Sequence, residues 1–356
     1  MSNPTSPRSL RVSVLDQTPV PEGTTSAAAL RNSIDLARHT DALGYHRYWV
    51  AEHHGSPMIA GPSPEVLISA IASAVPRMRV GSGGVMLPHY SALKVAENFS
   101  VLAGLFPNRI DLGLGRAAGT DPETAFALQR DRRQRSPDDF PQQLAELLGY
   151  LYDRLPREHP FRRLTALPGL PERPEPWLLG SSPQSAIWAA ELGLPYAFAD
   201  FINPAGAEIA ALYRDRFEPS EELSEPRVMV AVSAIAAETN AEAERLAASM
   251  RMAITLLRAG SSIAIPTVER ALEFLERYPS PQAMPIGRRA VVGDAAAVKS
   301  GLEAVVREYG ADEVMVVTIT HDHAARVRSY DLLATAFELD GAEAPVSTTS
   351  RATQLA

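Results

Sequence analysis

RYWVAEHH (residues 47–54), VGSGGVML (residues 80–87) and IDLGLGR (residues 110–116) are three short apolar runs that decide the fold of this chain. Helix signals separate them. Ser63-Pro64-Glu65 combines a capping serine, a proline at the first helical position and an acid in the first turn, and Ser91 can cap the next helix. Strands that alternate with helices pair in parallel, so the carboxyl ends of the three runs should share one rim.

The same alternation continues along the chain and predicts an α/β fold, namely a (β/α)8 TIM barrel. Several predicted strands are continuous apolar runs, as expected where both faces of a parallel sheet are covered. The predicted strands are residues 11–15, 47–54, 78–87, 110–114, 176–180, 196–201, 227–236 and 314–319. A doubly wound, Rossmann-like sheet is the alternative that this pattern leaves open.

Residues 10–340 should form a single barrel domain, and two stretches interrupt its rhythm. An irregular, charged stretch covers residues 117–175, after strand four. A mostly helical stretch covers residues 241–285, between strands seven and eight. We expect these insertions to form a lid and the substrate pocket. The polar ends, residues 1–9 and 342–356, are expected to be disordered.

Composition excludes several classes of function. The 356 residues, 46% of them apolar, can bury a large core. A net charge of −8 argues against a nucleic-acid partner or an anionic membrane surface. The absence of cysteine excludes disulfides, thiolate metal sites and thiol nucleophiles. The polar N-terminus and the lack of long apolar runs predict a soluble, cytoplasmic protein. Lys94 and Lys299 are the only lysines, which disfavours Schiff-base chemistry.

In barrels of this kind the active site lies at the C-terminal ends of the strands. The candidate residues are therefore the polar residues and glycines that come at or just after each predicted strand end. They are Asp16, Gln17, Glu52, His53, His54, residues 83–88, Gly115, Arg116, Ser181, Ser182, Ser185, Asp200, Phe201 and residues 321–323.

His53 and His54 raise the question of a metal site. Adjacent residues on a strand point to opposite faces, so the two imidazoles should not chelate one ion. A zinc site would also need ligands that the sequence does not supply, and we expect no metal. Two interpretations remain. One histidine packs in the core while the other caps a loop, or a neutral imidazole acts as a base or hydrogen-bond donor near pH 7.

Arg116 and Ser182 suggest an anion site. Ser182-Pro183 starts a helix, and free N–H groups at a helix N-terminus bind phosphate. Ser185 lies on the same first turn, and an arginine at a nearby strand end would complete a monophosphate site through bidentate hydrogen bonds. The competing interpretation is an ordinary helix cap beside a surface arginine.

Gly81, Gly83 and Gly84 leave the third strand without side chains at three positions. Glycine inside a strand marks either a β-bulge or close approach by a ligand or another backbone. The second interpretation would provide a seat for a flat ring.

Three segments resemble the bacterial luciferase-like flavin-dependent monooxygenases, closest to the small single-subunit oxidoreductases of that family. They are AEHHGSPMIAGPSPEVLISAIAS (51–73), VGSGGVMLPHYSALKVAENFSVLAGLFPNRIDLGLGR (80–116) and VVGDAAAVKSGLEAVVREYGADEVMVV (291–317). Some members are tailoring oxygenases of aromatic polyketide pathways, and so belong to antibiotic biosynthesis. The resemblance covers most of the chain and implies a (β/α)8 barrel.

Carried over by motif, the resemblance implies roles for the histidines and glycines. His53 matches the family's catalytic histidine, with His54 and Glu52 beside it to orient it. Gly83-Gly84 matches a position where the family has a non-proline cis peptide beneath the flavin ring.

The resemblance also implies the phosphate site of the flavin. Arg116 matches the arginine that holds the FMN phosphate, and Ser182 and Ser185 match the hydroxyl residues there, with Ser181 beside them. Gly115 stands where luciferase carries a thiol, so no thiol tunes the flavin here. Residues 117–175 also depart from luciferase, so aldehyde specificity is not implied.

The implied reaction is oxygenation of a small organic substrate, either hydroxylation or epoxidation. Reduced FMN, supplied by a separate flavin reductase, would react with O2 to a C4a-(hydro)peroxide, and His53 would hydrogen-bond it or act as base. A homodimer is expected from the family. A deazaflavin-dependent oxidoreductase, a phosphate-binding isomerase or aldolase, and a non-catalytic flavin-binding protein are the alternatives.

Overall fold

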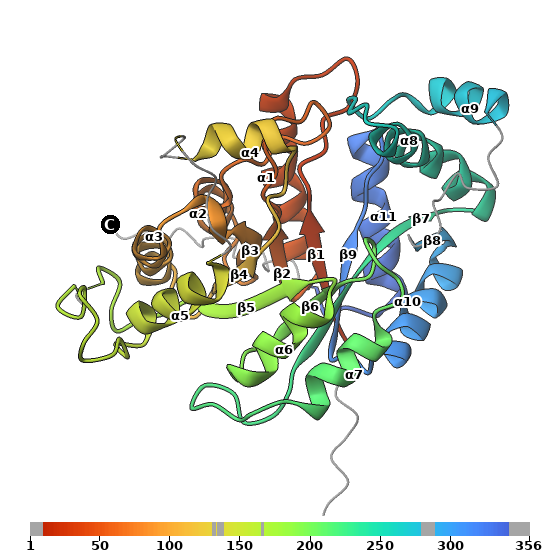
Figure 1. Cartoon of the computed structure of the whole chain (residues 1–356). Coiled ribbons are helices and arrows are strands. Elements are labelled where there is room, and N and C mark those ends of the chain that lie inside the picture. Colours follow the sequence, from red (N-terminus) through yellow and green to blue (C-terminus); the bar gives the residue numbers. More distant parts are fainter. Residues whose placement is uncertain (1–9, 130–132, 134–138, 165–166, 279–288, 342–356) are drawn as a thin grey trace, which may run out of the picture.

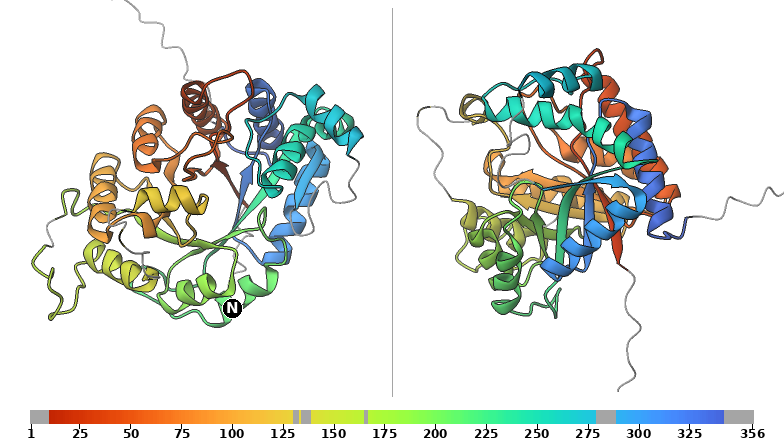
Figure 2. Two further views of the ribbon diagram at one scale, coloured as in Figure 1. Left: turned by 45° about the horizontal axis from the view of Figure 1, so that its top comes forward. Right: turned by 90° about the vertical axis from the view of Figure 1, so that its right-hand side faces the viewer.

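The computed structural model of the chain describes residues 10–129, 133, 139–164, 167–278 and 289–341. Its strands lie at the centre and helices surround them (Figures 1 and 2). All pairings between the named strands are parallel. The ends that the sequence predicts to be disordered, residues 1–9 and 342–356, lie outside the described residues.

Eight strands of the described part of the chain close into a barrel, which confirms the predicted (β/α)8 fold. They are β1 (Arg11–Asp16), β2 (Arg47–Val50), β3 (Arg79–Met86), β4 (Ile110–Gly115), β5 (Glu175–Gly180), β6 (Tyr196–Ala199), β7 (Val228–Ala237) and β9 (Glu313–Val317). The barrel closes because β7 pairs with β6 on one side and with β9 on the other, and β9 pairs with β1.

The helices follow the strands in alternation, and Ser63, the predicted cap of the helix that begins at Pro64, makes no side-chain capping hydrogen bond. They are α1 (Ser26–Ala42), α2 (Pro64–Ala74), the 3-10 helix η1 (Leu87–His89), α3 (Ala92–Leu105), α4 (Pro122–Leu128), α5 (Phe140–Leu151), α6 (Pro183–Glu191), α7 (Ala207–Asp215), α8 (Asn240–Arg258), α9 (Val268–Arg277), α10 (Ala295–Tyr309) and α11 (His323–Ala336). Thr25 caps α1 and Ser91 caps α3, each accepting from a backbone N–H three residues on.

The sequence missed one strand. β8 (Ala290–Asp294) pairs with the last five residues of β7, which begin at Ser233, the residue where the pairing of β7 with β9 ends. It therefore lies outside the closed barrel, beside the last part of the long β7 strand. Its side chains are mostly half-buried, and the five-residue sequence AVVGD lacks the long apolar run that indicated the barrel strands.

The stretch from 117 to 175 is more regular than predicted. It contains α4 and α5, and α5 packs against α3 as the ordinary crossover helix between β4 and β5. Phe140, Leu144, Leu147 and Leu151 recur at helical spacing and are buried. The sequence analysis did not predict α5, because the neighbouring charged run concealed this short amphipathic pattern.

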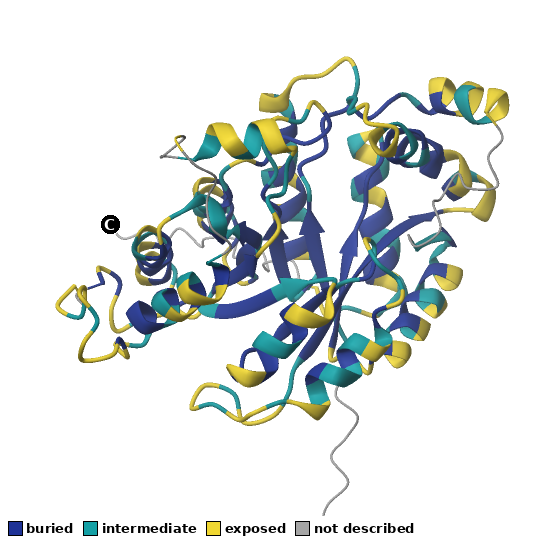
Figure 3. Cartoon of the chain, in the orientation of Figure 1, coloured by how far each residue is buried: buried dark blue, intermediate teal, exposed yellow. Residues whose placement is uncertain are grey.

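The barrel strands are buried on both faces. All ten residues of β7 are buried, because barrel side chains cover one face and helices cover the other. Exposed residues lie on the outer faces of the helices and in the loops (Figure 3). No helix in the described ranges is both long and apolar enough to span a bilayer.

A buried polar cluster fills the amino end of the barrel. Arg47 is 1% exposed and donates to Asp111 at 2.7 Å and to Glu313 at 2.7 Å. Arg79 also donates to Asp111. Burial raises the pKa of Asp111, but the guanidinium groups of Arg47 and Arg79 outweigh it and hold that pKa below its usual value. This cluster blocks one end of the barrel, so a ligand must enter at the other.

Candidate functional site

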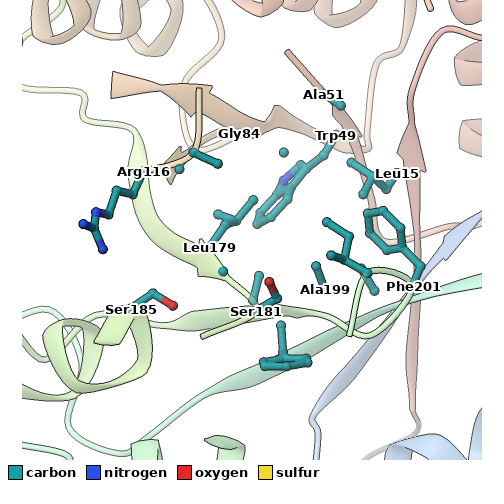
Figure 4. A pocket seen from close by; sticks show the side chains of 18 of the residues that line it. Leu15, Trp49, Ala51, Gly84, Arg116, Leu179, Ser181, Ser185, Ala199 and Phe201 are labelled. Atoms are coloured by element: carbon teal, nitrogen blue, oxygen red, sulfur yellow. The ribbon is translucent and has the colours of Figure 1, made fainter. Parts of the chain in front are cut away.

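A cavity of about 430 Å³ opens at the carboxyl ends of the barrel strands. Seven of the nine predicted site residues line it: His53, Gly83, Gly84, Arg116, Ser181, Ser182 and Ser185. Figure 4 shows Arg116 and Ser185 at one end of the cavity and Leu15 and Phe201 at the other, with Trp49 and Leu179 between them. The cavity is therefore polar at one end and mostly apolar elsewhere.

His53 lies just beyond the end of β2 and lines the cavity. β2 ends at Val50, four residues earlier than predicted, so His53 stands on a loop that crosses the rim. Its Nδ1 atom is buried and has no hydrogen-bond partner. Burial, and to a lesser degree the neighbouring His54, lower the pKa of His53 to about 4. The imidazole is neutral at pH 7 and can offer an unpaired nitrogen to a ligand.

Glu52 and His54 lie behind the cavity wall and do not line it. Glu52 is fully buried, and its carboxylate accepts from His54 Nε2 at 2.7 Å, from the Met86 N–H at 2.9 Å and from the Tyr90 hydroxyl at 3.0 Å. The contact with Met86 joins the loop that carries His53 to the end of β3, and the contact with Tyr90 joins it to the segment that follows η1. Glu52 therefore holds the cavity wall in place.

Arg116 stands at the end of β4, facing the start of α6. Its guanidinium carbon lies 5.5 Å from the ring centroid of Trp188, on α6. Ser182 occupies the N-cap position, but its side chain makes no capping hydrogen bond. The Ser185 hydroxyl donates instead to the Ser182 carbonyl at 2.9 Å and lies 3.0 Å from the Tyr196 hydroxyl. The first turn of α6 is thus left open to an anion beside an arginine.

The Gly83-Gly84 peptide bond is cis, as the family resemblance implied. The pairing of β3 with β4 shifts register between Ser82 and Val85, so the bulge interpretation of these glycines is also correct. A Cβ on Gly83 would lie 2.6 Å from Leu15 Cδ1, and a Cβ on Gly84 would lie 2.8 Å from the Gly113 carbonyl oxygen. The wall here is bare backbone against which a flat ring can lie.

Several lining residues were outside the predicted site. Trp49, Trp188, Phe198, Ile202 and Met315 supply apolar surface. Single apolar residues carry no sequence signal for a pocket, because the same residues fill ordinary cores. The inward alternation of β2 and β9 could have indicated Trp49 and Met315.

Other residues on the rim serve the fold. Asp16 is fully buried and accepts from Tyr48, Arg326 and the Thr18 N–H. His323 begins α11 and lies 3.0 Å from Asp35.

The described ranges contain no group of three or more His, Asp or Glu side chains that could hold a metal ion. The argument from strand alternation was wrong in its premise, however. His53 and His54 lie past the end of β2, and they are separated because His54 turns towards Glu52.

Comparisons with known proteins find similarity over nearly the whole chain. Residues 10–313 match the family model of the luciferase-like monooxygenases. A luciferase-like monooxygenase of Escherichia coli strain K12 is 42% identical over 91% of this chain and 96% of its own length. An N-acetyl-S-alkylcysteine monooxygenase of Bacillus subtilis strain 168 is 35% identical over 92% of this chain and 98% of its own.

A solved structure of high similarity is apo-MsnO8. It is 43% identical to this chain, covers 94% of it with 100% of its own length, and superposes with a TM-score of 0.86. The family model, the relatives and this structure extend over nearly the whole barrel and its cavity. The chain belongs to the luciferase-like monooxygenase family.

Proposed function

We propose that the protein is a flavin-dependent monooxygenase that uses reduced FMN and O2 to oxygenate a small organic substrate. One observation carries the proposal: the cavity combines an anion-binding end with a bare backbone wall and a neutral histidine. These are the three features that a monophosphorylated flat ring would need. Family membership supports the oxidoreductase class, and the cavity supports the choice of cofactor.

The residues fit FMN in a definite order. Arg116, Ser182, Ser185 and the first-turn N–H groups of α6 would hold the phosphate. The ring would lie against Gly83 and Gly84, where no side chain intervenes. When bound, reduced FMN supplies two electrons and two protons, so that O2 gives one oxygen atom to the substrate and the other leaves as water.

His53 is the residue best placed to handle a proton. Its neutral imidazole has an unpaired nitrogen, Nδ1, beside a cavity that is lined mostly by apolar residues. It can therefore hydrogen-bond a reacting group or accept a proton at neutral pH. Glu52 and His54 would act through position, because neither lines the cavity.

The size of the site favours a small substrate. A cavity of about 430 Å³ that would also have to hold the flavin ring leaves room for a short chain more readily than for a fused aromatic polyketide. The B. subtilis relative suggests a class, the N-acetyl-S-alkylcysteines. Oxygenation of such a thioether forms a sulfur–oxygen bond and yields the sulfoxide and water, with reduced FMN oxidised.

The test uses N-acetyl-S-methylcysteine as the probe. The protein is mixed with reduced FMN and then with 18O2, and the product is analysed by mass spectrometry. We expect sulfoxide carrying one 18O atom, and a lower yield with His53→Ala as electrons are diverted to hydrogen peroxide. If reduced FMN binds but no sulfoxide forms, the substrate class is wrong.

We further propose that a separate reductase supplies the reduced FMN and that the protein is a cytoplasmic homodimer. Val66 on α2 and Val101 and Leu105 on α3 are apolar and exposed, at 68%, 44% and 63%. Light scattering during gel filtration should give twice the chain mass, and Leu105→Glu should reduce it. A monomer mass for the unaltered protein would contradict the homodimer.

A further inference from the structure

A second, smaller hollow of about 30 Å³ adjoins the main cavity. Gln17 and Phe201 line both spaces, so they form the boundary between them. Figure 4 shows Phe201 at the end of the main cavity opposite Arg116. The hollow therefore lies beyond the end of the site that is remote from the proposed phosphate position.

Strand geometry explains why the hollow continues the cavity. On β7, Ala231 lines the cavity and Ser233 lines the hollow, and on β9 Met315 lines the cavity and Val317 the hollow. Residues two apart on a strand point to the same face of the sheet. Ala231 and Ser233, like Met315 and Val317, therefore both face the inside of the barrel. Helix α8 covers the hollow with two residues one turn apart, Met250 and Ile254.

The polar groups around the hollow are already bonded to the protein. The Ser233 hydroxyl donates to Met250 Sδ at 3.3 Å. Arg289 donates to both carboxylate oxygens of Asp200, at 2.7 and 3.2 Å, and to Glu308 at 2.6 Å. What remains for an occupant is the apolar surface of Met250, Ile254, Val317 and Ile319. The hollow therefore suits an alkyl group.

Gln17 differs from these polar neighbours. It is half-buried at the boundary, and its carboxamide makes no hydrogen bond within the described part of the chain. A carboxamide can both donate and accept. Gln17 is thus free to bond a polar atom of a ligand that extends from the main cavity into the hollow.

We propose that this hollow and Gln17 determine substrate specificity, by seating a short terminal alkyl group while Gln17 hydrogen-bonds the polar part of the same molecule. A single water needs roughly 10–15 Å³ of such space, so a hollow of about 30 Å³ accepts a methyl or ethyl group. This inference rests on the proposed oxygenase function and specifies the length of the alkyl chain.

The test compares N-acetyl-S-methyl-, ethyl-, propyl- and butylcysteine as substrates by kcat/KM. In the unaltered protein we expect kcat/KM to fall roughly tenfold or more from the ethyl to the propyl compound, the discrimination typical of one methylene in an apolar pocket. Ile254→Ala enlarges the hollow, so in this variant kcat/KM should fall between the propyl and the butyl compound instead. Leu257→Ala is the matched control, because Leu257 lies on the same helix, is 37% exposed and does not line the hollow.

Gln17→Leu tests the boundary. We expect KM for every probe to rise about five- to tenfold, as for one lost hydrogen bond, with the Kd of reduced FMN unchanged. Melting temperatures establish that each variant is folded. The inference is overturned if reduced FMN binds and the length profile is flat, is unchanged by Ile254→Ala, or cannot be measured because no probe is oxygenated. Failure of reduced FMN to bind would instead overturn the proposed function.

Discussion

At the scale of single residues, His53 is the most informative group. Its imidazole is held neutral by burial, and its Nδ1 has no partner in the protein. A buried nitrogen without a partner costs free energy, so it persists where a ligand or function uses it. The sequence identified His53 through its family resemblance, but only the structure shows this unpaired state.

The depressed pKa predicts a pH dependence of stability. The pKa of His53 is about 4 in the folded protein against 6.5 in the unfolded chain, so between these values the unfolded state binds more protons. The contribution of His53 to the free energy of unfolding is therefore fully present above pH 6.5 and is lost as the pH drops towards 4. From pH 7 to pH 5 this histidine alone should remove up to about 2 kcal/mol of unfolding free energy.

His53→Gln should abolish that part of the loss, which urea unfolding at pH 7 and pH 5 would measure. His46, whose pKa burial also lowers to about 4, provides the comparison, because His46→Gln should remove a separate contribution of the same sign. Equal losses in the unaltered protein and in His53→Gln would show that His53 is not held neutral.

At the scale of elements, the proposed phosphate site depends on two segments that meet, the end of β4 and the start of α6. Arg116→Ala removes the guanidinium from this junction. We expect the Kd for reduced FMN to rise by roughly 10- to 100-fold, as for the loss of charge-assisted hydrogen bonds. The Kd for reduced riboflavin, which lacks the phosphate, should change little.

Arg173→Ala is a matched control for this experiment. Arg173 is also exposed and lies 5.8 Å from an aromatic ring, that of Tyr152, but it is remote from the cavity. Equal weakening of reduced FMN and reduced riboflavin by Arg116→Ala would mean that Arg116 does not contact a phosphate.

The elements that could be predicted from sequence were those with caps and continuous apolar runs. Thr25, Ser91 and the run of β7 are examples, since local chemistry determines them. β8 could not be predicted, because its formation depends on pairing with an overlong β7. The polar residues that line the cavity could be predicted because polar groups at strand ends are conspicuous, whereas Trp49 and Met315 line it only through three-dimensional packing.

At the scale of the whole molecule, the barrel has a closed end and an open end. The Arg47 cluster ties β2 to β4 and β9 at the amino end, and Asp111 also accepts from the Trp49 indole at 2.8 Å. Trp49 is also a wall of the cavity. Stability at one end of the barrel is thereby linked to the shape of the site at the other.

Asp111→Ala should destabilise the protein by about 3–5 kcal/mol, because it leaves the buried Arg47 guanidinium partly unpaired. Urea unfolding would measure this. Glu221→Ala, which removes an exposed partner of Arg154, should cost less than about 1 kcal/mol. A similar small loss for Asp111→Ala would mean that the cluster does not support the barrel.

The central claim is that the open end of this barrel binds reduced FMN. Its most direct test is an anaerobic equilibrium titration of the protein with reduced FMN and, separately, with reduced deazaflavin cofactor. We predict saturable binding of one reduced FMN per chain, with a lower Kd than for the deazaflavin. Binding of the reduced deazaflavin without binding of reduced FMN would contradict the account.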